Sequence, residues 1–117
     1  MFKSLDLMIK MSFALYKFHV RGLIHSDLKL ENFFMMNEYT VILADFGISL
    51  SLFEKRDYRC GTDGFIAPEI NKKRVNTNDY TAAIDVFSLG IIFLEILTKN
   101  IYKNPNATIQ QMISLHC

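Results

Sequence analysis

Cysteine is scarce in this chain, and the charge is nearly balanced. Cys60 and Cys117 are its two cysteines, far apart, with no C-x-x-C motif and no histidine at zinc-ligand spacing. A disulfide framework and a zinc site are therefore not expected, and a reduced, cytoplasmic chain is the simple interpretation. Thirteen basic and twelve acidic side chains give a net charge of +1, which indicates no nucleic-acid partner and no acidic membrane surface.

The sequence also lacks a long hydrophobic run. The most apolar stretch, residues 86–97, contains Glu95 and is too short to span a bilayer, so it is predicted to be a buried core helix. Charged residues interrupt the apolar ones in the first ten positions, unlike the profile of a signal peptide. Half of the residues are hydrophobic, which suits one small domain, residues 1–117, with no membrane partner.

Hydrophobic periodicity predicts a mixed α+β chain that is mainly helical. Apolar residues at three- and four-residue steps predict an amphipathic helix over 3–20, ended by Gly22. Further helices are predicted at 82–98 and 109–116, each after capping residues. Residues 45–66 have no regular period and are predicted to form a long functional loop. Short strands are expected at 23–24, 33–36 and 41–44.

Two polar segments carry the residues that point to chemistry. His-Ser-Asp-Leu-Lys-Leu-Glu-Asn occupies residues 25–32, and Asp45 opens an Asp-Phe-Gly triplet. The carboxylate of Asp27 could orient a hydroxyl nucleophile and accept its proton. Asn32 and Asp45 offer the hard oxygen ligands that Mg²⁺ prefers. Either acid alone would be an ordinary turn or cap residue, but the spacing of the two segments argues against that interpretation.

Five signals in order resemble the eukaryotic protein kinases, and specifically the Ser/Thr branch. Residues 25–32 are similar to the catalytic loop H-R-D-x-x-x-x-N, and the triplet at 45–47 is similar to the magnesium-binding D-F-G. The other three are Gly-Thr at 61–62, Ala-Pro-Glu at 67–69 and the segment 85–90. This resemblance implies transfer of the γ-phosphoryl group of ATP to Ser or Thr hydroxyls of a protein substrate.

The resemblance assigns roles to the residues at the motif positions. Asp27 matches the catalytic aspartate, and Thr62 matches the threonine that bonds it. Lys29 matches the lysine that Ser/Thr kinases direct at the γ-phosphate. Phe34 takes the place of the aliphatic residue beneath the adenine ring. The implied catalytic set is Asp27, Lys29, Asn32, Asp45 and Thr62; ATP and Mg²⁺ are the implied cofactors, with Asn32 and Asp45 as metal ligands and Lys29, Asn32, Phe34 and Asp45 as the cofactor-binding residues.

Residues beside these motifs resemble the supports of a kinase site. Asp85 is similar to the aspartate of helix αF that accepts backbone N–H groups of the catalytic loop, and His25 and Phe46 are similar to two side chains that stack in an active kinase. Ser26 stands where most kinases have an arginine that receives an activation-loop phosphate. We therefore expect that phosphorylation would not activate the chain in that manner at Ser49, Ser51, Tyr58 or Thr62.

The resemblance covers less than half of a kinase domain. It corresponds to the C-lobe, from αE through the catalytic and D-F-G strands and the activation segment to αF and the start of αG, truncated at both ends. The five glycines form no G-x-G-x-x-G, so the N-lobe is expected to be absent. A working enzyme would then need a complementing N-lobe or a partner kinase. The alternative is a non-catalytic, kinase-like interaction module or pseudokinase fragment that binds a kinase or its substrate.

Overall fold

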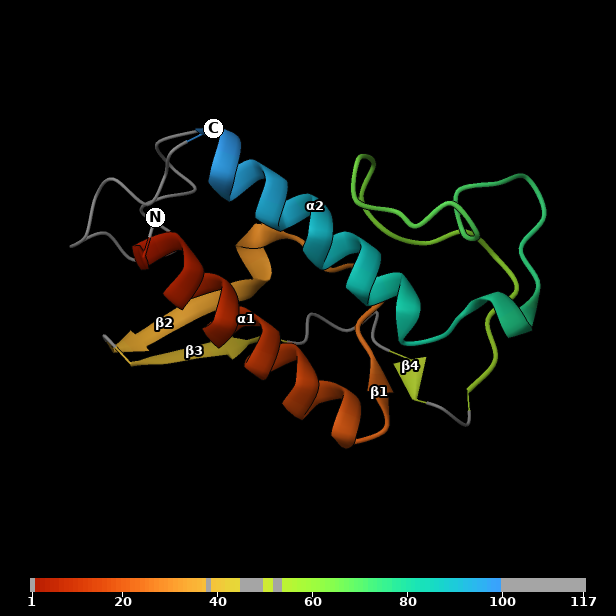
Figure 1. Cartoon of the computed structure of the whole chain (residues 1–117). Coiled ribbons are helices and arrows are strands. Elements are labelled where there is room, and N and C mark those ends of the chain that lie inside the picture. Colours follow the sequence, from red (N-terminus) through yellow and green to blue (C-terminus); the bar gives the residue numbers. More distant parts are fainter. Residues whose placement is uncertain (1, 38, 45–49, 52–53, 100–117) are drawn as a thin grey trace.

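Two long helices and two small antiparallel sheets make up the described part of the chain, which covers residues 2–37, 39–44, 50–51 and 54–99 of the computed structural model (Figure 1). The α+β class predicted from the sequence is thereby confirmed. In chain order the elements are α1 (Phe2–Val20), β1 (Leu23–Ile24), the 3-10 turn η1 (Leu30–Asn32), β2 (Phe33–Asn37), β3 (Thr40–Leu43), β4 (Leu50–Ser51), the 3-10 turn η2 (Thr77–Asp79) and α2 (Ala83–Lys99).

The two helices run antiparallel, so that the end of α1 lies beside the start of α2 (Figure 1). The main core forms where both helices meet the β2–β3 hairpin. Met11 of α1, Phe33 of β2 and Ile92 and Ile96 of α2 are each 0% exposed in this core. Burying apolar side chains of this size stabilises the chain by about 1.5–3 kcal/mol each. The core therefore fixes η1, which leads directly into β2, against both helices.

A second core lies under the long segment that connects β4 to α2. Ile24 of β1 and Leu50 of β4 pack there with Ile70, Val75 and Tyr80 of that segment. β1 and β4 pair antiparallel, with Leu23 opposite Ser51. The strand β4 was not predicted, because its two residues lie in a stretch without hydrophobic alternation. The pairing ties the start of the 54–82 segment to the strand that precedes residues 25–27.

The β2–β3 hairpin holds Asn32 close to the end of β3. Phe33 pairs with Leu43 and Phe34 with Ile42, and the register shifts between Met35 and Asn37. Just beyond the pairing, the amide N–H of Ala44 donates to the carbonyl of Asn32 at 2.9 Å. The last described residue before Asp45 is thereby fixed beside Asn32.

Both helix boundaries follow the predicted signals closely. Gly22 has a φ of 76° and donates its N–H to the carbonyl of His19, which ends α1 as a C-terminal glycine does. The hydroxyl of Thr81 accepts the N–H of Ala83 at the start of α2. The predicted helix at 109–116 lies outside the described residues. In the described chain neither helix combines the length and the apolarity that crossing a membrane requires.

The sequence predicted a buried core helix for the apolar stretch in α2, and one face of α2 packs against the described residues in the core. Ile84, Leu89, Ile92 and Ile96 are buried on that face. The opposite face leaves Val86 60%, Leu94 57% and Leu97 49% exposed. The difference arises because an apolar run specifies burial without specifying what each side of the helix contacts.

Candidate active site

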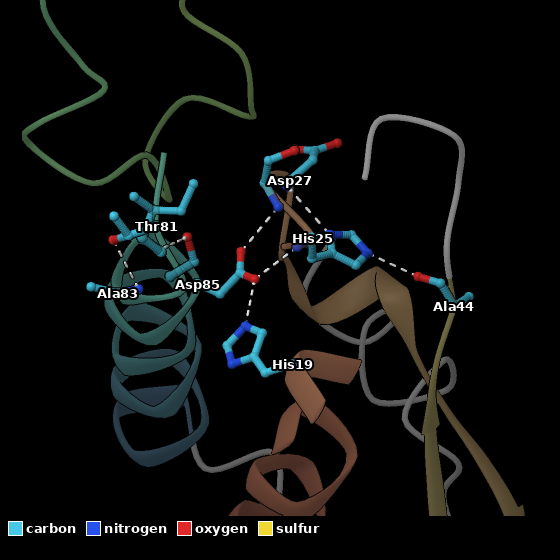
Figure 2. A network of polar contacts seen from close by, with 10 residues as sticks. His19, His25, Asp27, Ala44, Thr81, Ala83 and Asp85 are labelled. Carbon is cyan, nitrogen blue, oxygen red and sulfur yellow. Dashed lines mark hydrogen bonds and ion pairs between the residues drawn. The ribbon is translucent and has the colours of Figure 1, made fainter. Parts of the chain in front are cut away.

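A strained turn at residues 25–27 follows β1 and forms the base of the site. Ser26 has a φ of 65°, the one left-handed backbone among the described residues other than glycine. Such a conformation costs about 1–3 kcal/mol in a residue with a side chain, so the surrounding structure must hold it. Asp27 lies beside His25 in this turn, on the side away from His19 (Figure 2).

Asp85, in the first turn of α2, holds the turn through its carboxylate. It is 1% exposed and accepts the backbone N–H groups of His25 at 2.8 Å and Ser26 at 3.0 Å (Figure 2). Hydrogen bonds to an ionised acceptor are stronger than neutral ones. A carboxylate near a helix N-terminus also interacts favourably with the helix dipole. Asp85 thus accepts backbone N–H groups of the turn, as its resemblance implied, and these bonds offset the backbone strain of Ser26.

His19, at the end of α1, supplies a third partner for Asp85. Its Nε2 lies 2.8 Å from Oδ2 of Asp85 (Figure 2). Because a carboxylate only accepts, Nε2 carries the proton in this contact. Three donors therefore surround a buried acid that would otherwise be costly. Nothing in the sequence singles out His19, since the periodicity of its helix does not indicate a partner 66 residues away.

His25 links the turn to the end of β3 and orients Asp27. Its Nδ1 accepts the backbone N–H of Asp27 at 3.3 Å, which places the ring proton on Nε2, and Nε2 donates to the carbonyl of Ala44 at 2.8 Å (Figure 2). Its ring also lies against that of Phe18, with 5.4 Å between the centroids. Phe46, the expected stacking partner of His25, lies outside the described residues.

Asp27, Lys29 and Thr62 meet at the centre of the site. The Thr62 hydroxyl donates to Oδ1 of Asp27 at 2.6 Å and accepts from Nζ of Lys29 at 3.2 Å. Nζ of Lys29 is 3.7 Å from Oδ2 of Asp27. The side chains of Asp27 and Lys29 are 21% and 30% exposed, so they remain open to a ligand. A small pocket lies here, lined by residues that include Asp27, Gly61, Thr62 and Phe65.

The segment that carries Thr62 is fixed by its backbone and by α2. Gly61 has a φ of 128°, and a Cβ atom there would lie 3.0 Å from Cγ1 of Ile66 and 3.3 Å from the carbonyl oxygen of Ser26. Only glycine fits this close approach. On the other side of Thr62, the Ser88 hydroxyl of α2 donates to the carbonyl of Phe65 at 2.5 Å. Thr62 is therefore held between two fixed points.

Asn32 has the chemistry of one metal ligand. It is 2% exposed, and its Oδ1 accepts the backbone N–H of Lys29 at 3.0 Å. An amide oxygen has two lone pairs, so this bond leaves capacity for a hard cation such as Mg²⁺. The described residues contain no cluster of three His, Cys, Asp or Glu side chains that could hold a metal. A carboxylate from Asp45, which lies outside the described residues, would be the second ligand.

Phe34 lies in β2, opposite Ile42 and one residue after the buried Phe33. Its side chain is partly exposed and does not belong to the main core. The sequence predicted either an adenine-contacting residue or a core residue at this position. The partial exposure of Phe34 is compatible with a ligand contact.

The chain matches known proteins along most of its length. The family model described as protein kinase domain matches residues 3–116. Ribosomal protein S6 kinase alpha-4 of Homo sapiens is 38% identical over 89 residues, 73% of this chain and 11% of that protein. Serine/threonine-protein kinase SKM1 of Saccharomyces cerevisiae is 38% identical over 82 residues, 68% of this chain and 12% of that protein.

A third relative, from Caenorhabditis elegans, has a name that places it among the tyrosine-protein kinases. It is 38% identical over 88 residues, 72% of this chain and 26% of that protein. The chain thus spans between 11% and 26% of the lengths of these three relatives. The ordered motifs and the match over nearly all its residues show that the chain belongs to the eukaryotic-type protein kinase family.

Proposed function

We propose that residues 1–117 are a portion of the C-lobe of a protein serine/threonine kinase, with the N-lobe not represented in them. α1 would correspond to helix αE, α2 to αF, and residues 54–69 to the described C-terminal part of the activation segment. The order of the elements supports this assignment. So do the bonds from the turn at 25–27 to Asp85 at the start of α2.

The contact between Thr62 and Asp27 carries the functional proposal. A hydroxyl 2.6 Å from Oδ1 fixes the direction of the carboxylate, and the Asp27 side chain stays 21% exposed with Oδ2 at 3.7 Å from Nζ of Lys29. Oδ2 can then accept a hydrogen bond from the hydroxyl of a substrate Ser or Thr. This hydrogen bond orients the hydroxyl oxygen for attack on the γ-phosphorus of ATP. A positioned carboxylate of this kind is typical of general base catalysis.

In the proposed reaction Asp27 takes the proton of the substrate hydroxyl. The substrate oxygen forms a bond to the γ-phosphorus as the bond between that phosphorus and the β,γ-bridging oxygen breaks, and the bridging oxygen leaves with the electron pair as part of ADP. Lys29, 3.7 Å from Asp27, would place a positive charge beside the transferred group. Bound Mg²⁺, with Asn32 and Asp45 as its protein ligands, would neutralise charge on the phosphates.

The choice of substrate hydroxyl and the remaining nucleotide contacts complete the proposed site. Lys29 favours Ser or Thr substrates, since it follows the Ser/Thr-kinase pattern, and Phe34 would contact the adenine. An N-lobe, in the same polypeptide or from a partner kinase, would supply the remaining phosphate contacts. We place the reaction in the cytoplasm, with a protein substrate and without a nucleic-acid or membrane partner.

The test is transfer of labelled phosphate from [γ-³²P]ATP and Mg²⁺ to casein. It is measured on this chain and on the longest reading frame that contains it, followed by analysis of the labelled amino acids. We expect label on Ser and Thr with the longer product, and a fall of about 10²–10⁴-fold in Asp27→Asn, because positioned proton transfer contributes by that amount. Label on Tyr alone would refute the Ser/Thr assignment. A folded but inactive longer product would favour a non-catalytic binding module instead.

A further inference from the structure

Arg56 is a buried cation that the proposed reaction does not use. It is 8% exposed, although arginine is seldom buried without specific partners. Nη1 donates to the hydroxyl of Ser26 at 2.9 Å, across 30 residues of sequence. Arg56 therefore links the 54–82 segment to Ser26, the residue directly before Asp27.

Two tyrosine rings enclose the same guanidinium. Its Cζ lies 5.5 Å from the ring centroid of Tyr58 and 5.4 Å from that of Tyr80. The hydroxyl of Tyr80 donates to the backbone carbonyl of Tyr58 at 2.7 Å, so the two tyrosines are also linked by a hydrogen bond. Arginine stacks on aromatic faces and keeps a planar set of donors, a combination that lysine does not offer. Arg56, Tyr58 and Tyr80 thus contact one another and link the two ends of the 54–82 segment.

The turn at Ser26 is consequently held from two sides. Asp85 accepts its backbone N–H at 3.0 Å, while Arg56 bonds its side chain at 2.9 Å. The stretch with Thr62 is also anchored at both ends, by Arg56 before it and by the Ser88 bond to Phe65 after it. Shortening the free part of a segment lowers the entropy cost of ordering it. These two anchors therefore lower the entropy cost of holding Thr62 in its hydrogen bond to Asp27.

We propose that Arg56 is a positioning residue of this site, which holds the Thr62-bearing segment on the turn at Asp27 through the unmodified hydroxyl of Ser26. No phosphate on the segment is required for this contact, because its acceptor is a hydroxyl. The effect on phosphoryl transfer rests on the proposed function, whereas the ordering of the segment does not.

Amide hydrogen exchange of the whole 117-residue chain, followed by mass spectrometry of peptides, tests the ordering without ATP. In Arg56→Met we expect exchange in peptides covering 26–28 and 57–63 to accelerate at least about tenfold, since a hydrogen bond from a charged donor is lost. Arg56→Lys should restore part of the protection, because an ammonium still donates to Ser26. Arg59→Met is the matched control: Arg59 is exposed in the same segment and bonds Asp63 and Asn71 instead. Its exchange at 26–28 should stay unchanged.

Ser26→Ala separates positioning from general support of the fold. It removes the hydroxyl that Arg56 contacts and leaves the guanidinium in place, so exchange should rise in the distant 57–63 peptide. The double variant Arg56→Met/Ser26→Ala should exchange no faster than Arg56→Met. If Arg56→Met loses its helical circular dichroism, it has unfolded, and the exchange of the 57–63 peptide in Ser26→Ala then serves as the test of the proposal. Three results would each overturn the proposal. They are unchanged exchange at 57–63 in Ser26→Ala, exchange effects of the two substitutions that simply add in the double variant, and no protection of 57–63 in the unsubstituted chain. An inactive longer product, together with a protected 57–63 peptide in this chain, would refute the proposed function and leave the positioning intact.

Discussion

His19 and Asp85 join the end of α1 to the start of α2 by a contact of 2.8 Å between Nε2 and Oδ2. The same carboxylate holds the turn that presents Asp27. One acid therefore couples the antiparallel packing of the helices to the geometry of the candidate site. Disturbing it should affect stability and site together.

Asp85→Ala should be among the most destabilising single substitutions in the described chain. It leaves the N–H groups of His25 and Ser26 buried without an acceptor, at about 1–3 kcal/mol each. We expect the free energy of unfolding in urea to fall by about 3 kcal/mol or more. Asp63→Ala is the control, because the Asp63 side chain is 88% exposed. Similar losses for the two variants would show that the Asp85 bonds contribute nothing special.

The strain at Ser26 can be measured by comparing two substitutions that both remove its hydroxyl. Alanine keeps the unfavourable φ of 65°, whereas glycine adopts this conformation without steric cost. We expect Ser26→Gly to be more stable than Ser26→Ala by about 1 kcal/mol in urea denaturation. An alanine variant as stable as the glycine variant would mean that the turn relaxes in solution.

Gly61 and Gly90 should respond to alanine in opposite directions. Gly61→Ala combines a φ of 128° with close contacts to Ile66 and to the Ser26 carbonyl, so it should lower the thermal midpoint and loosen Thr62. Gly90 lies within α2, and nothing occurs within 4 Å of a Cβ added there. Gly90→Ala should therefore stabilise the chain by about 0.5–1 kcal/mol, the helix-propensity difference. Destabilisation by both variants would contradict the environment of Gly90.

Local patterns in the sequence predicted the bounds of α1 and α2 and the strands β2 and β3 well, though not the pairing of these strands. The three- and four-residue spacing and Gly22 placed the bounds of α1 nearly to the residue. The predicted apolar face was wrong, because most of the residues that carry that spacing are exposed, namely Leu5, Ile9, Phe13, Tyr16 and Val20, whereas Leu7, Met11, Ala14, Leu15 and Phe18 are buried. β4 escaped prediction, because its two residues become a strand only by pairing with β1. A strand of that length has no periodicity of its own. Long-range pairing therefore marks the limit of what local sequence pattern can predict.

In the candidate site, too, the sequence predicted the residues of local motifs but not the long-range contacts. Motif resemblance placed Asp27, Lys29, Asn32 and Thr62 together, and they do lie together; their catalytic roles stay a proposal. The supporting contacts of His19 and Arg56 were not foreseen, because each joins residues far apart in sequence with no shared motif. Such pairs form because a buried polar or charged group needs a partner, and which residues are buried together is known only from the folded structure.

Alkaline pH should destabilise the chain through Tyr80. Burial is the main cause that raises the pKa of its phenol above the ordinary value of 10.0, and the Cys60 thiol contributes in the same direction. The folded state then holds the proton more tightly than the unfolded state. Its contribution to stability is therefore complete below pH 10.0 and is lost as the pH rises through the folded pKa. Between about pH 9 and pH 11.5, an interval that brackets the ordinary phenol pKa, the unfolding free energy should fall less steeply with pH in Tyr80→Phe.

Thr62 offers the sharpest comparison at the site, because valine and serine differ in whether the hydroxyl remains. Thr62→Val is nearly isosteric but removes both the donor to Asp27 and the acceptor of Lys29, whereas Thr62→Ser keeps them. In an active longer product we expect kcat to fall at least about tenfold in Thr62→Val, because a hydrogen bond to a charged acceptor is lost, and to change little in Thr62→Ser. KM for ATP should change less than kcat if the hydroxyl orients Asp27 and does not bind the nucleotide. Equal kcat values for the serine and valine variants would show that the hydroxyl is dispensable, and the role of Thr62 would then reduce to packing.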